Sequence, residues 1–382
     1  MTGPGGRPVR IVIVASVIAR YDAISIAVRD TVRAFRNAGG FDVSAFTARS
    51  DFPDLGADQV HDGRALRAHR TFRAADVAIY HFGVFSPLFE VLSRGSGRMR
   101  QIVIFHNVTP PEYVAPVQQA IVERSLQQLE TFRNVDRYWA VSPTNADALV
   151  ARGIDRDRID VIPLAVERPA PAALGQKSAP PVRLLFVGRL VRSKGVLDLI
   201  EAIDLVRTRT TIPFQLDIAG NEDFSDPAYV AEAKAALAGR GLSKFGRFLG
   251  AVDDAKLDEL YRAAHLLVIP SYHEGFCRPV IEGLRAGCVP VGYAAYNLPH
   301  AAHGFGRMAP VGDRDALATA VVELIAALVP GSARLLPLDA GPLAAVDFDR
   351  AAQEYVQEFT FERVAGRMVR GVQELEHARL DR

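Results

Sequence analysis

The chain has 382 residues, of which 49% are hydrophobic and 23% charged, and this composition excludes a disordered or fibrous protein. Its 45 Lys and Arg residues nearly balance 44 Asp and Glu residues, so the formal net charge is +1. Such a balance gives no electrostatic reason to expect a nucleic-acid partner. At roughly 150 residues per domain, the length predicts two domains.

Apolar segments near the start of the chain are too short to span a membrane. The run from Ile11 to Ala19 lies between two arginines, well below the ~20 residues of a spanning helix, and no cleavage-site pattern follows it. Residues 1–170 hold 21 basic and 18 acidic residues, and residues 171–382 hold 24 and 26. We therefore expect a cytoplasmic protein whose membrane association is at most peripheral.

The sequence gives no sign of a metal site. Two cysteines, Cys277 and Cys288, cannot build a disulfide framework or a four-thiolate zinc site. Asp-x-Asp patterns begin at Asp155, Asp313 and Asp347, and we interpret all three as structural acids of loops rather than cation ligands. No metal and no cofactor are expected.

The first half alternates strand-type and helix-type segments, which predicts βα units over a mostly parallel sheet. Helices are expected at Ala23 to Asn37, at Pro116 to Phe132, and after an N-cap at Ser142 followed by Pro143. The predicted strands are Arg10 to Val17, Phe41 to Ala48, Val77 to His81, Gln101 to His106, Arg137 to Val141 and Ile159 to Pro163.

The same alternation restarts in the second half and predicts a second parallel sheet. The predicted strands are Val182 to Val187, Phe214 to Ala219, Arg247 to Leu249, Leu266 to Ile269 and Val289 to Tyr293. The predicted helices begin at Lys194 and cover Tyr229 to Ala238, Asp254 to Ala264, Pro279 to Ala286 and Arg314 to Leu328.

A stretch rich in Pro and Ala separates the two halves and is typical of a linker. We therefore predict a first domain over 1–165, a linker over 166–180 and a second domain over 181–345. Residues 346–382 carry apolar side chains at helical spacing and are expected to cross back to the first domain.

A segment with two carboxylates, Glu274 to Glu282, follows a predicted strand and includes Pro279, which opens a helix. Backbone N–H groups in such a turn favour an anionic ligand. They belong to Gly275, Phe276 and Cys277. Glu282, expected in the first helical turn, could accept hydrogen bonds from a diol. Taken alone, the two acids fit a loop carboxylate and a helix-start carboxylate better than a site.

A second segment, Gly188 to Gly195, occupies the first strand-to-helix turn of the same half. Gly188 permits close approach of a ligand to the backbone, and Arg189 and Lys194 supply two cations to the same crevice. The combination fits a diphosphate and weakens the interpretation of Glu274 as an ordinary loop acid.

With these motifs in this order, the sequence resembles the family 4 glycosyltransferases of the GT-B fold, which transfer a sugar from a nucleotide sugar with retention of configuration. The resemblance covers nearly the whole chain and is strongest from Leu184 to Val291. Further landmarks are Ile104-Phe-His106, Ala140-Val-Ser142, Ile159-Asp-Val-Ile-Pro163, Asp217-Ile-Ala-Gly220, Phe248-Leu-Gly-Ala-Val252 and Ala286-Gly-Cys-Val-Pro-Val291. The implied fold is α/β, with two Rossmann-like doubly wound domains facing each other across a cleft.

The resemblance also implies roles for residues of the second domain. Arg189 and Lys194 would hold the donor diphosphate, and Glu282 would bind the ribose hydroxyls. Glu274 and the turn amides would grip the transferred sugar and phosphate. The remaining positions expected to line the donor site are Gly188, Gly220 and Val252.

In the first domain, the resemblance makes His106 the active-site histidine, near the transferred sugar and the leaving phosphate. His81 ends another strand at the cleft, and its role as an acceptor contact or as a packing residue is left open. A structural role as a strand-end residue is the alternative for His106.

The activity implied is transfer of a hexosyl group to a hydroxyl acceptor without a metal. The acceptor could be a glycan, a lipid-linked intermediate or a secondary metabolite. Retention would follow from front-face attack or from a covalent intermediate on a carboxylate. Other hypotheses are a non-catalytic GT-B subunit or nucleotide-sugar-binding protein, and another GT-B enzyme such as a nucleotide-sugar epimerase or a phosphorylase.

Overall fold

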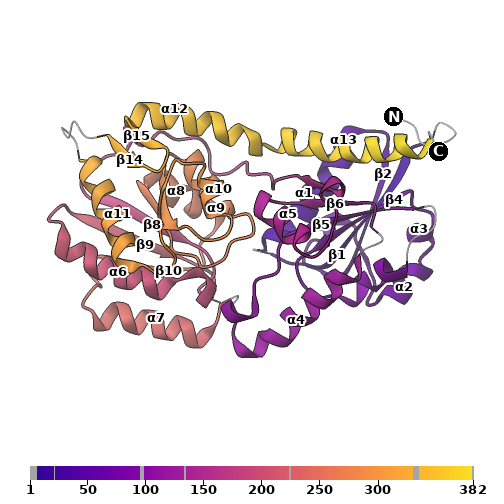
Figure 1. Ribbon diagram of the computed structural model, residues 1–382, viewed down its shortest axis with the longest axis horizontal. Helices are drawn as coiled ribbons and strands as arrows, with labels where there is room; N and C mark the ends of the chain where they lie inside the picture. The colour runs from indigo at the N-terminus through magenta and orange to yellow at the C-terminus, as the bar shows by residue number, and fades with distance from the viewer. Residues whose placement is uncertain are drawn as a thin grey trace. The chain divides into compact units, whose positions relative to one another are not determined.

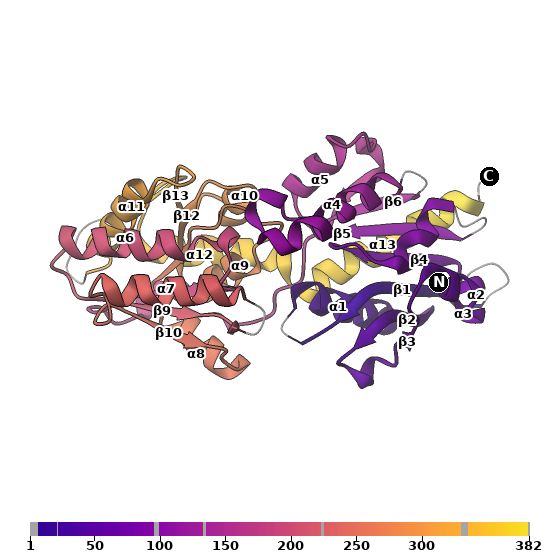
Figure 2. The same cartoon turned by 90° about the horizontal axis from the view of Figure 1, so that it is seen from below.

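The computed structural model describes residues 7–20, 22–94, 99–132, 135–222, 225–329 and 335–380. The chain forms two compact units. The first contains the chain up to Pro111, Pro116–Ala165 and everything from Phe359, and the second contains Glu112–Ala115 and Val166–Glu358. Both units are layered α/β structures (Figures 1 and 2).

The first unit is built on a seven-stranded parallel sheet of order β3-β2-β1-β4-β5-β6-β7. The order reverses between β1 and β4, and open α/β sheets bind ligands at the carboxyl ends of strands beside such a reversal. The strands are β1 (Val9–Ile18), β2 (Phe41–Ser50), β3 (Asp58–Gln59), β4 (Val77–Phe82), β5 (Arg100–Phe105), β6 (Arg137–Ala140) and β7 (Ile159–Val161).

Helices cover both faces of this sheet (Figure 2). The helix α1 begins after Asp22, whose carboxylate accepts from the Ser25 N–H, and it packs against α13. Gly371 of α13 lies against the buried ring of Trp139. The helices are α1 (Ala23–Ala38), α2 (Gly63–Ala68), α3 (Arg70–Arg73), α4 (Pro116–Glu130), α5 (Pro143–Val150) and α13 (Phe361–Leu380).

The second unit has a six-stranded parallel sheet of order β10-β9-β8-β11-β12-β13, which reverses between β8 and β11. A separate antiparallel pair, β14 and β15, completes its strands. The strands are β8 (Val182–Val187), β9 (Phe214–Ala219), β10 (Gly246–Gly250), β11 (Leu266–Ile269), β12 (Val289–Tyr293), β13 (Arg307–Ala309), β14 (Leu336–Leu338) and β15 (Gly341–Leu343).

In the second unit α6 packs between α7 and α11, while α9 packs against α10 and α12 (Figure 1). The helices are α6 (Val196–Arg209), α7 (Pro227–Gly239), α8 (Asp254–Ala263), α9 (Arg278–Arg285), α10 (Leu298–Ala302), α11 (Arg314–Ala327) and α12 (Ala345–Val356). Short 3₁₀ helices along the chain are η1 (Pro53–Leu55), η2 (Pro87–Arg94), η3 (Pro111–Tyr113), η5 (Arg156–Arg158), η6 (Leu174–Gln176), η7 (Arg192–Lys194) and η9 (Gln357–Phe359). Within the described ranges, no helix is both long and apolar enough to cross a membrane.

The residues predicted as a linker and as C-terminal helices have defined contacts. Residues 166–180 belong to the second unit, where the Leu174 N–H donates to Asp349 at 2.6 Å and the Lys177 ammonium donates to the Gly287 carbonyl at 3.0 Å. Of the C-terminal helices, α12 packs on the second unit and α13 on the first. A Pro-rich stretch that shows neither a helical nor a strand period can therefore have a fixed conformation when groups distant in sequence hydrogen-bond to it.

Gly195 is required by the turn between β8 and α6. Its φ is +64°, and a Cβ there would lie 2.0 Å from the Pro270 carbonyl oxygen at the end of β11. We predict that Gly195→Ala lowers the free energy of unfolding by at least ~2 kcal/mol, from the left-handed backbone plus the overlap with a carbonyl. Gly239→Ala in α7 is the control, because nothing lies within 4 Å of its added Cβ. Equal urea unfolding midpoints for Gly195→Ala and Gly239→Ala would contradict the conclusion that the turn requires glycine at position 195.

Candidate functional site

The donor-type half of the site lies where β8 and β9 end in the second unit. Gly188 follows β8 and Gly220 follows β9. A Cβ on Gly220 would lie 2.3 Å from the Gly188 carbonyl oxygen, so the two backbones approach more closely than any side chain allows. Close packing of the two backbones at the ends of β8 and β9 therefore explains why residue 220 is glycine.

An ion pair joins the loops that follow β8 and β11, on the two sides of the sheet reversal. The Lys194 ammonium lies 2.6 Å from Oε1 of Glu274, and their side chains are 20% and 8% exposed. The Ser271 hydroxyl donates to the same Oε1 at 2.8 Å. Among the described residues, Oε2 of Glu274 has no hydrogen-bond donor, so one carboxylate oxygen remains for a ligand.

The turn from Gly275 to Cys277 leads into α9. Cys277 has φ +66° and is the N-cap residue without a side-chain cap, and the N–H groups of Gly275 and Cys277 donate to no described residue. The Asn297 amide donates to the Phe276 carbonyl at 3.0 Å and fixes the turn. The Cys277 side chain is buried, and burial raises the pKa of its thiol. The turn therefore has backbone N–H groups available for a ligand, whereas the Cys277 thiol packs in the interior.

Glu282 lies in the interior of α9 rather than in its first turn as predicted. The helix begins at Arg278, one residue before the expected start, so Glu282 falls just beyond the first turn, which contains no acidic residue. The Tyr261 hydroxyl donates to its Oε2 at 2.8 Å, and the Arg278 guanidinium lies 3.4 Å from its Oε1. Burial and the neighbouring Glu282 raise the pKa of Tyr261, which keeps this donor protonated.

Two other expected donor-site residues stand apart from this network. Arg189 is exposed on the loop after β8, and among the described residues no carboxylate pairs with it. Val252 is half-buried in the loop between β10 and α8. Sequence reasoning missed Ser271, Asn297 and Tyr261. These three act through contacts that no local pattern signals, whereas the pair of Arg278 and Glu282 is readable from its i, i+4 spacing.

In the first unit, the two singled-out histidines contact each other. His81 is on β4 and His106 follows β5, and Nδ1 of His81 lies 2.9 Å from Nε2 of His106. The rings stack with centroids 5.1 Å apart at 18°. His81 is 2% exposed, which favours packing over acceptor contact, the two roles left open for it, whereas His106 is half-buried.

The backbone around His106 is tightly fixed. The His106 N–H donates to the Phe82 carbonyl at 2.8 Å. Asn107 has φ +99°, a conformation that costs free energy in a non-glycine residue and is typical of functional sites. A Cβ on Gly83 would overlap Cδ1 of Ile24 at 2.5 Å, whereas its 3.4 Å distance from the His106 Cβ is an ordinary contact, so Ile24 rather than the histidine ring requires glycine here.

Asp313 and Asp347, which begin two of the Asp-x-Asp patterns, make structural contacts. Asp313 caps α11 by accepting from the Ala316 N–H at 2.9 Å, and Asp347 lies 2.8 Å from the Arg350 guanidinium. Asp155 precedes η5 without a side-chain cap. In the part of the chain that the structure describes, no group of three or more His, Cys, Asp or Glu side chains could hold a metal ion.

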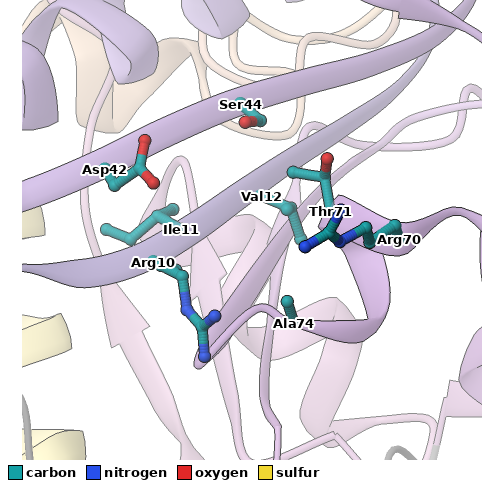
Figure 3. A pocket seen from close by; sticks show the side chains of 8 residues that line it. All are labelled: Arg10, Ile11, Val12, Asp42, Ser44, Arg70, Thr71 and Ala74. Atoms are coloured by element: carbon teal, nitrogen blue, oxygen red, sulfur yellow. The ribbon is translucent and has the colours of Figure 1, made fainter.

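A hollow of about 350 Å³ lies at the opposite, amino-terminal edge of the first sheet (Figure 3). It is lined by β1, β2 and α3 through Arg10, Ile11, Val12, Asp42, Ser44, Arg70, Thr71 and Ala74. Asp76 lies 3.6 Å from the Arg10 guanidinium and also binds Arg7. Ligands of open α/β sheets bind at the carboxyl ends of strands, so the hollow is not the candidate site.

Comparison with known proteins identifies the class. The family model described as Glycosyltransferase Family 4 matches residues 24–168, and the one described as Glycosyl transferases group 1 matches residues 174–327. A solved structure of Anabaena HepE in complex with UDP-glucose superposes with a TM-score of 0.71 at 15% identity, covering 96% of this chain and 99% of that one. The chain has the GT-B fold and belongs to the family 4-like glycosyltransferases.

Curated relatives match over part of their length. The O-antigen chain mannosyltransferase B of Escherichia coli is 26% identical over 238 residues, which are 59% of this chain and 61% of that protein. The D-inositol 3-phosphate glycosyltransferase of Nocardia farcinica is 32% identical over 180 residues, 44% of this chain and 39% of that protein. The chain thus spans less than two thirds of either relative.

The histidine pair predicts acid sensitivity of the first unit. Burial lowers the pKa of His106 to about 3 from an ordinary value of 6.5. Between these values the unfolded chain binds more protons than the folded one, so stability falls as the pH falls through this window. We expect the free energy of unfolding to drop by about 2 kcal/mol from pH 7 to pH 5 through His106.

Urea unfolding followed by fluorescence of Trp139, the single tryptophan of the chain, reads this out because Trp139 lies on β6 of the first unit. The matched control is His106→Gln, which cannot titrate and should show a shallower loss between pH 7 and pH 5. An unchanged slope in that variant would contradict the prediction.

Proposed function

We propose that the chain transfers a hexosyl group from a nucleotide-diphosphate sugar to a hydroxyl acceptor, with retention and without a metal ion. The observation that carries the proposal is the contact of Lys194 with Glu274, which immediately precedes the turn whose Gly275 and Cys277 N–H groups donate to no described residue. A cation and two amides suit a diphosphate, and a buried carboxylate with one open oxygen suits a sugar hydroxyl. The donor would bind the second unit and the acceptor the first.

The difficult event in this reaction is departure of the nucleoside diphosphate. Breaking the bond between the sugar C1 and the phosphate oxygen leaves negative charge on the β-phosphate. Lys194, Arg189 and the turn amides would stabilise that charge, which does the work a metal ion does in other transferases. In a front-face route the departing phosphate oxygen takes the proton of the acceptor hydroxyl, so no separate base is needed.

The carboxylates have separate tasks in this proposal. Oε2 of Glu274 would accept from a hydroxyl of the transferred sugar, because Oε1 is already occupied by Lys194 and Ser271. Glu282, oriented by Tyr261 and Arg278, would accept from the ribose diol. His106 would contact the sugar or the leaving phosphate from the first unit.

The known relatives support the donor class. The two curated relatives are named as a mannosyltransferase and a glycosyltransferase, and the HepE structure contains UDP-glucose. The acceptor is a hydroxyl compound, for which a glycan precursor, a lipid-linked intermediate and a small metabolite are the candidates.

Removing either member of the ion pair should impair sugar transfer. We predict that Lys194→Ala and Glu274→Gln each lower kcat for transfer by about 100-fold or more, as loss of a charge-stabilising group commonly does. Lys256→Ala is the control, because Lys256 is an exposed lysine of the same unit paired with Glu259. Near-normal transfer by both site variants in a radiolabelled-sugar assay would refute these roles.

Nucleotide binding tests the donor site without knowledge of the acceptor. Thermal unfolding with UDP, GDP, ADP, dTDP or CMP should give a selective stabilisation by one diphosphate, worth ~2.7 kcal/mol at a hundredfold its Kd. The shift should persist in EDTA and disappear in Lys194→Ala. A shift that requires magnesium would contradict the metal-independent proposal, and none with any nucleotide would favour the non-catalytic alternative.

A further inference from the structure

The two histidines of the first unit form a hydrogen-bonded pair that the proposed reaction does not explain. In the parallel register of β4 and β5, His81 lies opposite Ile104, two residues before His106. Residues two apart on a strand project from the same face, so the fold itself brings the two rings together. One N–H must lie between Nδ1 of His81 and Nε2 of His106, which are 2.9 Å apart.

The other nitrogen of His81 decides which ring donates. Nε2 of His81 is buried and has no hydrogen-bond partner among the described residues. If His106 donated, the His81 proton would sit on Nε2 as a buried N–H without an acceptor. If His81 donates through Nδ1, Nε2 carries only an unpaired lone pair, and native proteins leave buried acceptors unpaired more readily than buried N–H groups.

We propose that His81 donates its Nδ1–H to Nε2 of His106 and thereby holds His106 in the tautomer with its proton on Nδ1. Among the described residues Nδ1 of His106 has no hydrogen-bond partner, and it is not one of the buried unpartnered nitrogens, so it is open to a ligand. His106 is then a preset neutral donor, and His81 is a positioning residue rather than an acceptor contact.

The pair gives His106 a defined task. An Nδ1–H donor suits a hydroxyl oxygen or a phosphate oxygen and cannot act as a general base. This last step rests on the proposed function, because the group that receives the bond is the transferred sugar or the leaving phosphate. The tautomer itself does not depend on the reaction.

Nuclear magnetic resonance of the full chain labelled with ¹⁵N-histidine tests the tautomer directly. Long-range ¹H–¹⁵N spectra, assigned with His81→Asn and His106→Gln, should show both histidines protonated at Nδ1 and unprotonated at Nε2. Protonation of His106 at Nε2 overturns the proposal. This readout needs no transfer activity, so it stands apart from failure of the proposed function.

Two amide variants separate positioning from packing. In His81→Asn the amide nitrogen takes the place of Nδ1 and keeps the donor, whereas in His81→Gln it takes the place of Nε2 and loses it. His81→Gln should lower kcat at least tenfold with the nucleotide Kd unchanged, and His81→Asn should recover most of that loss. Equal loss in both variants overturns the proposal, and so does a rise in acceptor KM alone.

A double-mutant cycle tests whether His81 acts through His106. In a His106→Ala background, His81→Gln should cause no further loss of kcat, whereas full additivity overturns the proposal. Nucleotide Kd and the urea midpoint from Trp139 fluorescence verify that each variant is folded. If the wild-type chain transfers no sugar, the proposed function fails while the tautomer result still decides the inference.

Discussion

The ion pair between Lys194 and Glu274 is the contact on which the donor-type site depends, because it joins the loops that leave β8 and β11 on either side of the sheet reversal. Both side chains are largely buried, so loss of one partner leaves an unpaired charge that typically costs 3–5 kcal/mol. Gly195 allows this contact, since its missing side chain lets the first loop approach Pro270. The loop that carries Lys194 is thereby joined to the start of the turn from Gly275 to Cys277.

The same topological rule places the histidines in the first unit. That sheet reverses between β1 and β4, and His81 lies at the carboxyl end of β4, in register with Ala15 of β1. His106 follows the adjacent strand, held by the strained turn at Asn107. Both units therefore carry their unusual polar contacts at the reversal, where the strand ends are least covered by their own helices. Neither contact is explained by the stability of the sheets.

Sequence patterns predicted the longer elements and missed several short ones, some of which bury apolar side chains, such as Leu66 of α2 and Leu336 of β14. The edge strand β3 is two exposed polar residues, and β14 and β15 each contain a proline, so none has a strand period. Residues 166–180, predicted as a linker, belong to the second unit, where Lys177 and Asp349 make contacts remote in sequence. Residue types and spacing were enough to single out Lys194, Glu274 and His106 in the sequence. The hydrogen bond between His81 and His106 could be recognised only once the order of the strands was known. An error of one residue in the predicted start of α9 placed Glu282 in the first turn, whereas it lies just beyond that turn.

Backbone amide hydrogen exchange, with and without the nucleoside diphosphate that stabilises the protein most, is the decisive measurement for the donor site. We predict protection in peptides that cover 188–195 and 274–282, with protection of the Gly275 and Cys277 amides lost in Lys194→Ala. Protection elsewhere in the second unit with these segments unchanged would contradict the donor site described here.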